Sequence, residues 1–265
     1  MQKLNGPLIS VVMPSFNSAS FIDVAIQSVI TQTYTNWELI IADGGSTDDT
    51  HKIIEHKMRL FPTCFITLIK NKRDQGPADA RSIAIKFSRG SYVAFLDADD
   101  IWDESKLSKQ IDYMEKECIE FCYTLFHRIS PSGKNISGPL DANKNYTYIQ
   151  YLKKRGIGNS TVILKKELLS DDVISTITKY AEDTLWWLLI LKKNHKAFCL
   201  ELDLVGYRIS SDSRSRNIFL NQKKVFKMYT KVLRIPLPLA AYYHFLYLCD
   251  VIIRRIRLFL NMRYL

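Results

Sequence analysis

The stretch Tyr92-Val93-Ala94-Phe95-Leu96-Asp97-Ala98-Asp99-Asp100 decides how the chain is organised. Its first five residues are a short apolar run that predicts a buried strand, and three carboxylates follow. Carboxylates this close repel by about 1 to 4 kcal/mol per pair at 4 Å, so the cluster favours a nearby cation. One interpretation is a divalent metal ion that holds a phosphorylated substrate. The alternative is that Asp100 caps the next helix, with Asp103 and Glu104 in its first turn.

Strand-like and helix-like segments alternate around this stretch. The expected strands are 8–13, 37–42, 64–69 and 91–96, and the expected helices are about 18–32, 48–60, 77–87 and 104–116. Strands joined by single helices form a mostly parallel sheet, which binds ligands beyond the carboxyl ends of its strands. We therefore expect the groups that follow the first, second and fourth strands, 14–17, 43–48 and 97–100, to meet in one crevice.

The second half of the chain is less regular. A stretch rich in Pro, Gly, Ser and Asn at 130–145 predicts a surface connection. After it we expect a short helix near 146–154, an extended segment at 160–164, a helix around 183–193 and strands near 197–207.

The bulk composition indicates a reduced, well-packed protein. In 265 residues, 47% are hydrophobic, which is enough for a sizeable core. The five cysteines are an odd number without a C-x-x-C pair, which argues against a disulfide framework and a zinc ribbon. No secretory signal precedes the first strand, so we expect a cytoplasmic location.

The net charge of +10 lies entirely in the last segment. Residues 214–265 carry 11 Lys and Arg against one acid, Asp250, whereas residues 1–213 are neutral overall. This distribution argues against nucleic acid as a partner. The apolar run 235–253 contains prolines, a histidine and an acid, so a basic amphipathic helix in the plane of an anionic membrane surface fits it better than a helix that crosses. The alternative is a core helix that covers the body.

Four further motifs accompany the acidic stretch, in a fixed order. They are Pro14-Ser15-Phe16-Asn17, Asp43-Gly44-Gly45-Ser46-Thr47-Asp48, Gly76-Pro77-Ala78-Asp79-Ala80-Arg81 and Ala181-Glu182-Asp183. With the acidic stretch they resemble the P-x-Y-N, D-G-S-x-D, G-x-x-x-A-R, E-D and D-x-D-D patterns of family 2 glycosyltransferases over roughly residues 7–215. The resemblance implies the GT-A fold, an α/β fold with a Rossmann-like, mostly parallel sheet flanked by helices. It also implies a catalytic domain at 1–213, with a nucleotide half at about 1–126 and an acceptor half at about 127–213, before the helical basic tail.

The resemblance assigns the donor-binding residues. Asp43 would accept the hydrogen bond of the uracil imide, although a turn aspartate is the alternative. Phe16 stands where the family has a tyrosine and would stack on the base, and Arg81 would contact the nucleotide or the pyrophosphate. Pro14 and Asn17 would shape the same pocket.

The resemblance also assigns the acidic stretch. Asp97 would contact the ribose, and Asp99 would bind Mn²⁺ or Mg²⁺ between the donor phosphates, with Ala98 between them. Gly45, from the second motif, joins the donor-binding set. The cation would stabilise charge on the departing nucleoside diphosphate.

The E-D motif supplies the expected base. Asp183, with Glu182 beside it, would take the proton from the acceptor hydroxyl, and the alternative is that both acids cap a helix. One base with direct displacement predicts inversion at the anomeric carbon. The later segment 207–213 is similar to a Y-R-x-H-x-x-S loop, but Ser210 replaces the histidine.

The sequence thus predicts an inverting, metal-dependent enzyme that moves a hexose or N-acetylhexosamine from a UDP-sugar to a lipid-diphosphate-linked saccharide in surface polysaccharide synthesis. Its expected location is peripheral, on the inner face of the cell membrane. The alternatives are a non-catalytic nucleotide-sugar-binding protein, a fragment of a processive synthase, and a nucleotidyltransferase. This sequence lacks the Q-x-x-R-W motif that a processive synthase would have. It also lacks the basic, Gly-rich N-terminal loop that a nucleotidyltransferase would need.

Overall fold

The structure is a computed structural model that describes residues 6–71, 76–139, 145–175, 182–209 and 218–261, without the side chains of 182, 218–221 and 254–261. The strands are β1 (Ile9–Ser15), β2 (Trp37–Asp43), β3 (Ile66–Lys70), β4 (Tyr92–Phe95), β5 (Ile101–Trp102), β6 (Phe121–Ile129), β7 (Asn145–Tyr146), β8 (Ile163–Lys165) and β9 (Ala197–Arg208). The helices are α1 (Ile22–Ile30), α2 (Thr50–Leu60), α3 (Pro77–Phe87), α4 (Lys106–Lys116), α5 (Tyr148–Lys153), α6 (Asp171–Ile174), α7 (Glu182–Lys192), α8 (Ile218–Lys227) and α9 (Leu237–Asn261). Short 3₁₀ turns cover Asn159–Thr161 and Lys166–Leu168, and a π-helical segment covers Met228–Val232.

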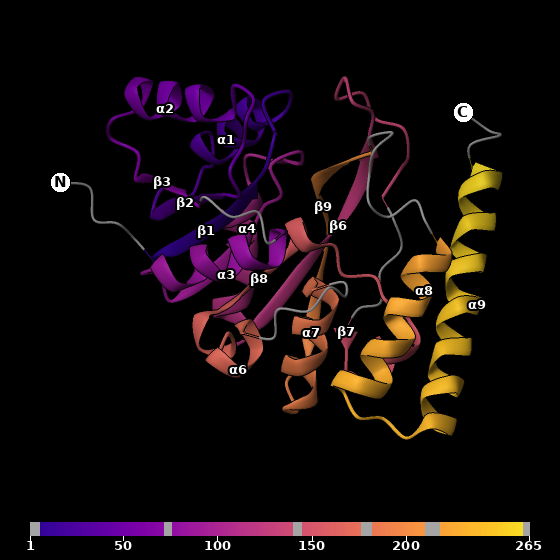
Figure 1. The fold of residues 1–265 in the computed structure, drawn as a ribbon. Coiled ribbons are helices and arrows are strands. Elements are labelled where there is room, and N and C mark those ends of the chain that lie inside the picture. Colours follow the sequence, from indigo (N-terminus) through magenta and orange to yellow (C-terminus); the bar gives the residue numbers. More distant parts are fainter. Residues whose placement is uncertain (1–5, 72–75, 140–144, 176–181, 210–217, 262–265) are drawn as a thin grey trace.

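The described strands form one sheet in the order β3-β2-β1-β4-β8-β6-β9-β5, and β7 also pairs with β9 (Figure 1). The pairings among β1, β2, β3 and β4 are parallel, as the alternation with helices predicts. Beyond β4 the sheet is mixed, because β8 runs antiparallel to both β4 and β6. The regular alternation of strand and helix ends at α4, so the second half is free to pair in both directions.

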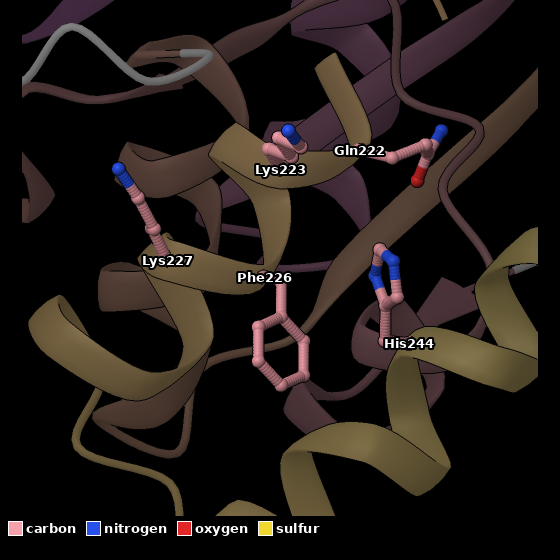
Figure 2. A pocket seen from close by; sticks show the side chains of 5 residues that line it. All are labelled: Gln222, Lys223, Phe226, Lys227 and His244. Carbon is pink, nitrogen blue, oxygen red and sulfur yellow. The ribbon is translucent and has the colours of Figure 1, made fainter. Parts of the chain in front are cut away.

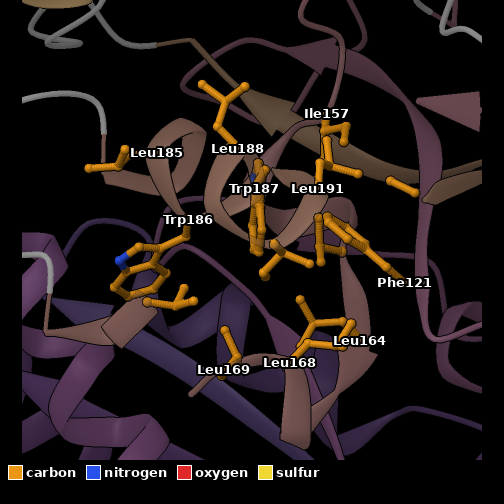
Figure 3. Close-up of a cluster of buried hydrophobic side chains, with 14 of the residues drawn as sticks. Phe121, Ile157, Leu164, Leu168, Leu169, Leu185, Trp186, Trp187, Leu188 and Leu191 are labelled. Carbon is orange, nitrogen blue, oxygen red and sulfur yellow. The ribbon is translucent and has the colours of Figure 1, made fainter. Parts of the chain in front are cut away.

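Side chains of alternate strand residues lie on opposite faces of the sheet and form two apolar layers, one on each face. Val12, Val93 and Phe95 belong to the layer under α7, whereas Val11 and Ala94 belong to the layer on the other face. In the first layer Trp187 is fully buried, and its ring centre lies 5.1 Å from that of Phe121 (Figure 3). The ring centre of Phe95 lies 5.2 Å from that of Trp187. This aromatic packing fixes α7, and therefore the position of its N-terminus, against the sheet.

The basic tail folds onto the body as α8, the π-helical segment and α9, which lie together at one side of the molecule (Figure 1). The guanidinium of Arg155, just after α5, lies over the rings of Tyr229 and Tyr247 at 5.3 and 4.3 Å. The hydroxyl of Tyr229 donates to the carbonyl of Leu152. One face of the tail is thus a packing face, as the core-helix alternative expects. Within the described chain, every helix is too short or too polar to span a bilayer.

Candidate active site

The loops after β1 and β2 are joined by hydrogen bonds. The side chain of Asn17 accepts from the backbone N–H of Thr47 at 2.9 Å, and the N–H of Asn17 donates to the hydroxyl of Ser46 at 2.8 Å. Asn17 has φ of 46°, a left-handed conformation that asparagine tolerates better than most residues. The first two expected groups therefore do meet at one edge of the sheet.

Asp43 ends β2 and is completely buried. Its two oxygens accept five hydrogen bonds, from the hydroxyls of Ser15 and Ser46, the N–H groups of Gly45 and Ser46, and the ring of His51. Burial raises the pKa of Asp43, but the bonds from Ser46, Ser15 and His51 outweigh it and hold the pKa below its usual value. This geometry matches the turn alternative, and contact with uracil stays a prediction.

Phe16, Gly45 and Pro14, the other predicted residues of these two loops, have different structural roles. Phe16 is 41% exposed, so its side chain is accessible from solvent at the surface of the site. Gly45 has φ of 90°, which gives the tight turn that lets two N–H groups converge on Asp43. Pro14 is a buried part of β1, paired with Ala42, so it supports the loop from within the sheet.

The acidic loop follows β4 at the same edge, because β4 is the parallel neighbour of β1. Asp97 accepts two bonds on one oxygen, Oδ1: from Arg81 Nη2 at 2.6 Å and from Asn159 Nδ2 at 2.9 Å. Its backbone N–H donates to the hydroxyl of Ser160 at 3.0 Å. Arg81 is buried and paired with Asp97, and Ala98 is buried with Val11 and Ala94 in the apolar layer on the face of the sheet opposite α7. Asn159 and Ser160 lie in the 3₁₀ turn before β8, and the sequence assigned neither of them to the site.

Asp100 is buried under this loop and does not cap a helix. Its oxygens accept from the hydroxyl of Ser160 and from the N–H of Arg208. The capping alternative is wrong, because α4 begins at Lys106 after Ser105, and Asp103 binds the N–H of Ser105 before the helix starts. Burial, with the charges of Asp99 and Asp97, raises the pKa of Asp100 well above its usual value.

Arg208 ties the acidic loop to two other loops. Its Nε donates to the carbonyl of Asp99 at 2.7 Å, and its Nη1 donates to the carbonyls of Ser130 and Pro131. The guanidinium also lies 4.7 Å from the ring centre of Phe21, which follows the β1 loop. Arg208 therefore holds the backbone of the acidic loop and packs against the residue that precedes α1. The rest of the predicted loop at 207–213, including Ser210, lies outside the described residues after position 209.

Asp99 is the acid of this loop with no hydrogen bond to its side chain from another described residue. Burial and the charge of Asp97 raise its pKa to about 6. Two adjacent carboxylates, one of them without a bonded partner, fit a hard divalent cation that takes its other ligands from a bound diphosphate. Among the described residues, no group of three or more His, Cys, Asp or Glu side chains is gathered to hold a metal by itself.

Tyr207 relates the acidic loop to Asp183. Burial raises the pKa of Tyr207, and so do the charges of four carboxylates, Asp100, Asp97, Asp99 and Asp183. Asp183, the base predicted from the sequence, and the carboxylates of the acidic loop therefore all lie within electrostatic range of the Tyr207 hydroxyl. Asp183 is partly exposed in the first turn of α7, where Oδ1 accepts from the N–H of Thr184 at 2.6 Å. Glu182 begins α7, and its side chain lies outside the described part.

Comparison with a solved structure defines the class. The mannosyltransferase PcManGT from Pyrobaculum calidifontis, solved in complex with GDP-Man and Mn²⁺, superimposes with a TM-score of 0.66 over 90% of this chain and 68% of its own, at 17% identity. The protein has the GT-A fold of glycosyltransferases, as the resemblance implies.

Sequence comparison defines the family. The family model for glycosyl transferase family 2 matches residues 10–172. The UDP-Glc:alpha-D-GlcNAc-diphosphoundecaprenol beta-1,3-glucosyltransferase WfgD of Escherichia coli is 37% identical over 89% of this chain and 90% of its own length. The putative teichuronic acid biosynthesis glycosyltransferase TuaG of Bacillus subtilis is 31% identical over 86% and 90%. The chain belongs to glycosyl transferase family 2, and it is a glycosyltransferase.

Proposed function

We propose that this glycosyltransferase is inverting and metal-dependent, and that it moves a hexose or N-acetylhexosamine from a UDP-sugar to a lipid-diphosphate-linked saccharide in surface polysaccharide synthesis of the O-antigen or capsule type. The observation that carries the proposal is the arrangement around Tyr207, where the acidic loop and Asp183 lie within range of one hydroxyl. A donor at the acidic loop would then meet an acceptor at Asp183.

The donor would lie across the loops that follow β1, β2 and β4. Phe16 would stack on the base, and the turn organised by Asp43, with Asn17, Pro14 and Gly45, would form the wall of the base pocket. Asp97, held by Arg81 and Asn159, keeps Oδ2 free of any hydrogen bond within the described chain and would present it to the ribose.

A divalent cation, Mn²⁺ or Mg²⁺, would be held by Asp99 beside Asp97 and Ala98. When bound, it would neutralise charge on the nucleoside diphosphate as the sugar leaves. The raised pKa of Asp99 supports this proposal. Burial and the charge of Asp97 make the ionised carboxylate of Asp99 unfavourable, and a bound cation would offset this cost. The Mn²⁺ in the complex of PcManGT agrees with a metal in this fold.

Asp183 would act as the general base, with Glu182 next to it. It would accept the proton of the acceptor hydroxyl while that oxygen attacks the anomeric carbon from the side opposite the diphosphate. The bond to the nucleoside diphosphate breaks as the new glycosidic bond forms, so the configuration at this carbon inverts. The fixed N-terminus of α7, packed through Trp187, supports this role because a base must hold its position.

The acceptor proposal is supported by relatives. WfgD is named for a UDP-Glc donor and an alpha-D-GlcNAc-diphosphoundecaprenol acceptor, and it matches almost the whole chain. We therefore propose an acceptor of this chemical class, a saccharide joined through a diphosphate to a long apolar lipid. Such an acceptor cannot leave the membrane, so the enzyme must work at its surface.

The outward face of α9 is suited to that surface. Leu239, Tyr242, Phe245, Ile252 and Ile253 are each 42 to 62% exposed and follow helical spacing, whereas Ala240 and Tyr243 on the other face are buried. We propose that this outward face lies on an anionic membrane at the inner side of the cell membrane, with the lysines of the tail against the head groups. A second copy would fit this face poorly, because it would bring two basic tails together.

The test is transfer itself. The full chain is incubated with Mn²⁺, a panel of UDP-sugars and lipid-diphosphate-linked acceptors, and the product is analysed for mass and anomeric configuration. One added β-sugar from an α-linked donor is expected. Repeated addition would indicate a processive synthase, and release of pyrophosphate would indicate a nucleotidyltransferase. UDP-sugar binding without turnover across the whole panel, by a folded protein, would favour a non-catalytic binder.

A further inference from the structure

The hollow between α8 and α9, lined in part by Phe226 and His244, has an almost wholly apolar surface (Figure 2). It therefore offers a polar ligand few hydrogen bonds. A group of buried polar side chains next to the acidic loop is better placed to act on the reaction, because it is bonded to the turn that holds this loop. The group consists of Trp102, Lys106 and Gln110.

The 3₁₀ turn at 159–161 holds the acidic loop through hydrogen bonds. Asn159 Nδ2 donates to Asp97 Oδ1 at 2.9 Å. The hydroxyl of Ser160 accepts from the N–H of Asp97 at 3.0 Å and donates to Asp100 Oδ2. Every residue of the turn is at most 5% exposed. The positions of both carboxylates therefore depend on the position of the turn.

Two consecutive carbonyl groups of this turn accept hydrogen bonds from buried side chains. Trp102 Nε1, on β5, donates to the carbonyl of Ser160 at 2.7 Å. Gln110 Nε2, on α4, donates to the carbonyl of Thr161 at 2.9 Å. Both donor side chains are buried, so a lost bond would leave a buried carbonyl without a partner. The place of the turn thus depends on these two donors.

Lys106 orients both donors. Its Nζ donates to Gln110 Oε1 at 2.9 Å and lies over the ring of Trp102, 4.1 Å from the ring centre. An ammonium group only donates hydrogen bonds, so it keeps the amide oxygen of Gln110 toward itself and leaves the amide N–H₂ for Thr161. Its attraction to the face of the indole restrains Trp102 as well.

The placement of Lys106 is not what packing alone favours. Its side chain is completely buried, and burial lowers its pKa to about 7, with no carboxylate of the described chain to offset the shift. Lysine is almost never fully buried without a paired charge, and an apolar side chain of similar volume would avoid the cost of desolvation. A role beyond packing is therefore expected of this amine.

We propose that these three side chains are positioning residues of the donor site: Trp102 and Gln110 hold the turn at 159–161, and Lys106 orients both. They act through the turn on the acidic loop. The inference rests on the proposed function and deepens it, because it adds buried residues outside the sequence motifs that set the affinity for a metal-bound nucleoside diphosphate.

The first measurement needs no ligand. K106M replaces the amine with an apolar side chain of similar length. K57M is the matched control, because Lys57 is also buried and donates to a glutamine, Gln27 Oε1, at 2.9 Å. Residue-resolved amide hydrogen exchange is followed at the N–H groups of Asp97 and Arg208, which are bonded to the turn and to the acidic loop, respectively.

We expect K106M to speed exchange at both N–H groups by about tenfold, since the turn loses its fixed position, whereas K57M should leave both rates unchanged. W102F removes the bond to Ser160 but keeps an aromatic ring beside Lys106. It should give the same effect, and it decides the case if K106M does not fold. Unchanged rates in the folded variants would overturn the inference. An equal rise in K106M and K57M would also overturn it, because that would indicate a general loss of stability.

The second measurement is calorimetric titration with UDP and Mn²⁺. K106M should weaken binding by about tenfold in the unaltered chain but by no more than about threefold in a chain that carries N159A, where one bond through which Lys106 acts is already absent. K57M should leave the affinity unchanged in both backgrounds. An equal loss from K106M in both backgrounds would mean that Lys106 does not act through the turn, and the inference would fail.

The two measurements separate this inference from the proposed function. If the unaltered chain binds no UDP with Mn²⁺ while K106M still speeds exchange in the acidic loop, the proposed function fails and the positioning of the loop stands. If the unaltered chain binds UDP and transfers sugar but exchange is the same in K106M and K57M, the positioning role fails alone.

Discussion

The side-chain amide of Asn159 donates to Oδ1 of Asp97 at 2.9 Å, although the two residues are 62 positions apart in the chain. Arg81 donates to the same oxygen, so Asp97 is held from two sides. We expect N159A to weaken binding of UDP with Mn²⁺ by roughly tenfold, because a bond to a charged group contributes about 1.5 to 3 kcal/mol. Calorimetric titration measures this. N36A, which removes an exposed amide bonded to the carbonyl of Gly6, is the matched control and should bind normally.

Asp43 offers a test between its two interpretations. In the unaltered chain the N–H groups of Gly45 and Ser46 donate to the Asp43 carboxylate. D43N keeps the shape of the side chain but replaces one acceptor oxygen with an amide N–H₂ group. We therefore expect it to lower the free energy of unfolding by about 1 to 3 kcal/mol. Urea unfolding and UDP affinity are measured on the same preparation. Loss of affinity with unchanged stability would contradict the turn role and favour direct contact with uracil.

The raised pKa of Asp99 predicts a pH dependence for metal binding. Mn²⁺ binds the ionised carboxylate, so its affinity should rise about tenfold per pH unit below about 6 and level off above it. Without metal, the folded chain holds this proton more tightly than the unfolded chain, whose pKa is near 3.8. The contribution of Asp99 to stability should therefore fall as pH rises from about 4 to about 6. D97N removes the charge that helps to raise the pKa of Asp99, so the pH at which Mn²⁺ affinity is half-maximal should fall. An unchanged pH midpoint would argue against an electrostatic effect of Asp97 on Asp99.

Asp183 should affect turnover and not donor binding. We expect D183N to lower kcat by about 10² to 10⁴-fold, because general base catalysis contributes about that much, while UDP affinity stays unchanged. D171N, at the exposed start of α6, controls for loss of a surface acid at a helix start. Near-normal turnover of D183N would exclude this carboxylate as the base, and E182Q would then be tested in its place.

The outward face of α9 should determine membrane binding. F245E/I252E places charges where exposed apolar side chains now lie, so we expect at least tenfold weaker binding to anionic vesicles with normal folding, since each buried apolar side chain contributes about 1.5 to 3 kcal/mol. Sedimentation with vesicles measures the effect. V24E/F65E alters two side chains of similar exposure outside the tail and should leave binding unchanged.

The sequence predicted the part of the fold that depends on local pattern. The alternation of strands and helices up to α4 gave the parallel half of the sheet, and α3 covers the expected residues 77–87. The short strand β5, which pairs with β9, was not expected. A two-residue strand has no periodic signal, and it exists only because β9 lies beside it.

The site divides in the same way. The motifs fixed which residue types gather at the ends of β1, β2 and β4, because parallel strands carry their loops to one edge. Only the tertiary structure decided what holds them: Asn159 on Asp97, Ser160 and Arg208 on Asp100, and His51 on Asp43. Except for His51, which lies eight residues after Asp43 on α2, these partners are 60 or more residues apart, and a hydrogen bond between distant segments leaves no local pattern.

The tail shows the same division most clearly. The sequence by itself determined that the segment is basic, apolar and helical, because charge and spacing are properties of the chain. It did not decide which face of the helix packs, since several faces of α9 carry apolar residues. The tertiary structure made that choice by burying Ala240 and Tyr243 and leaving Phe245 and Ile252 outside. The physical reason is that a helix buries only the face for which the body provides a complementary surface.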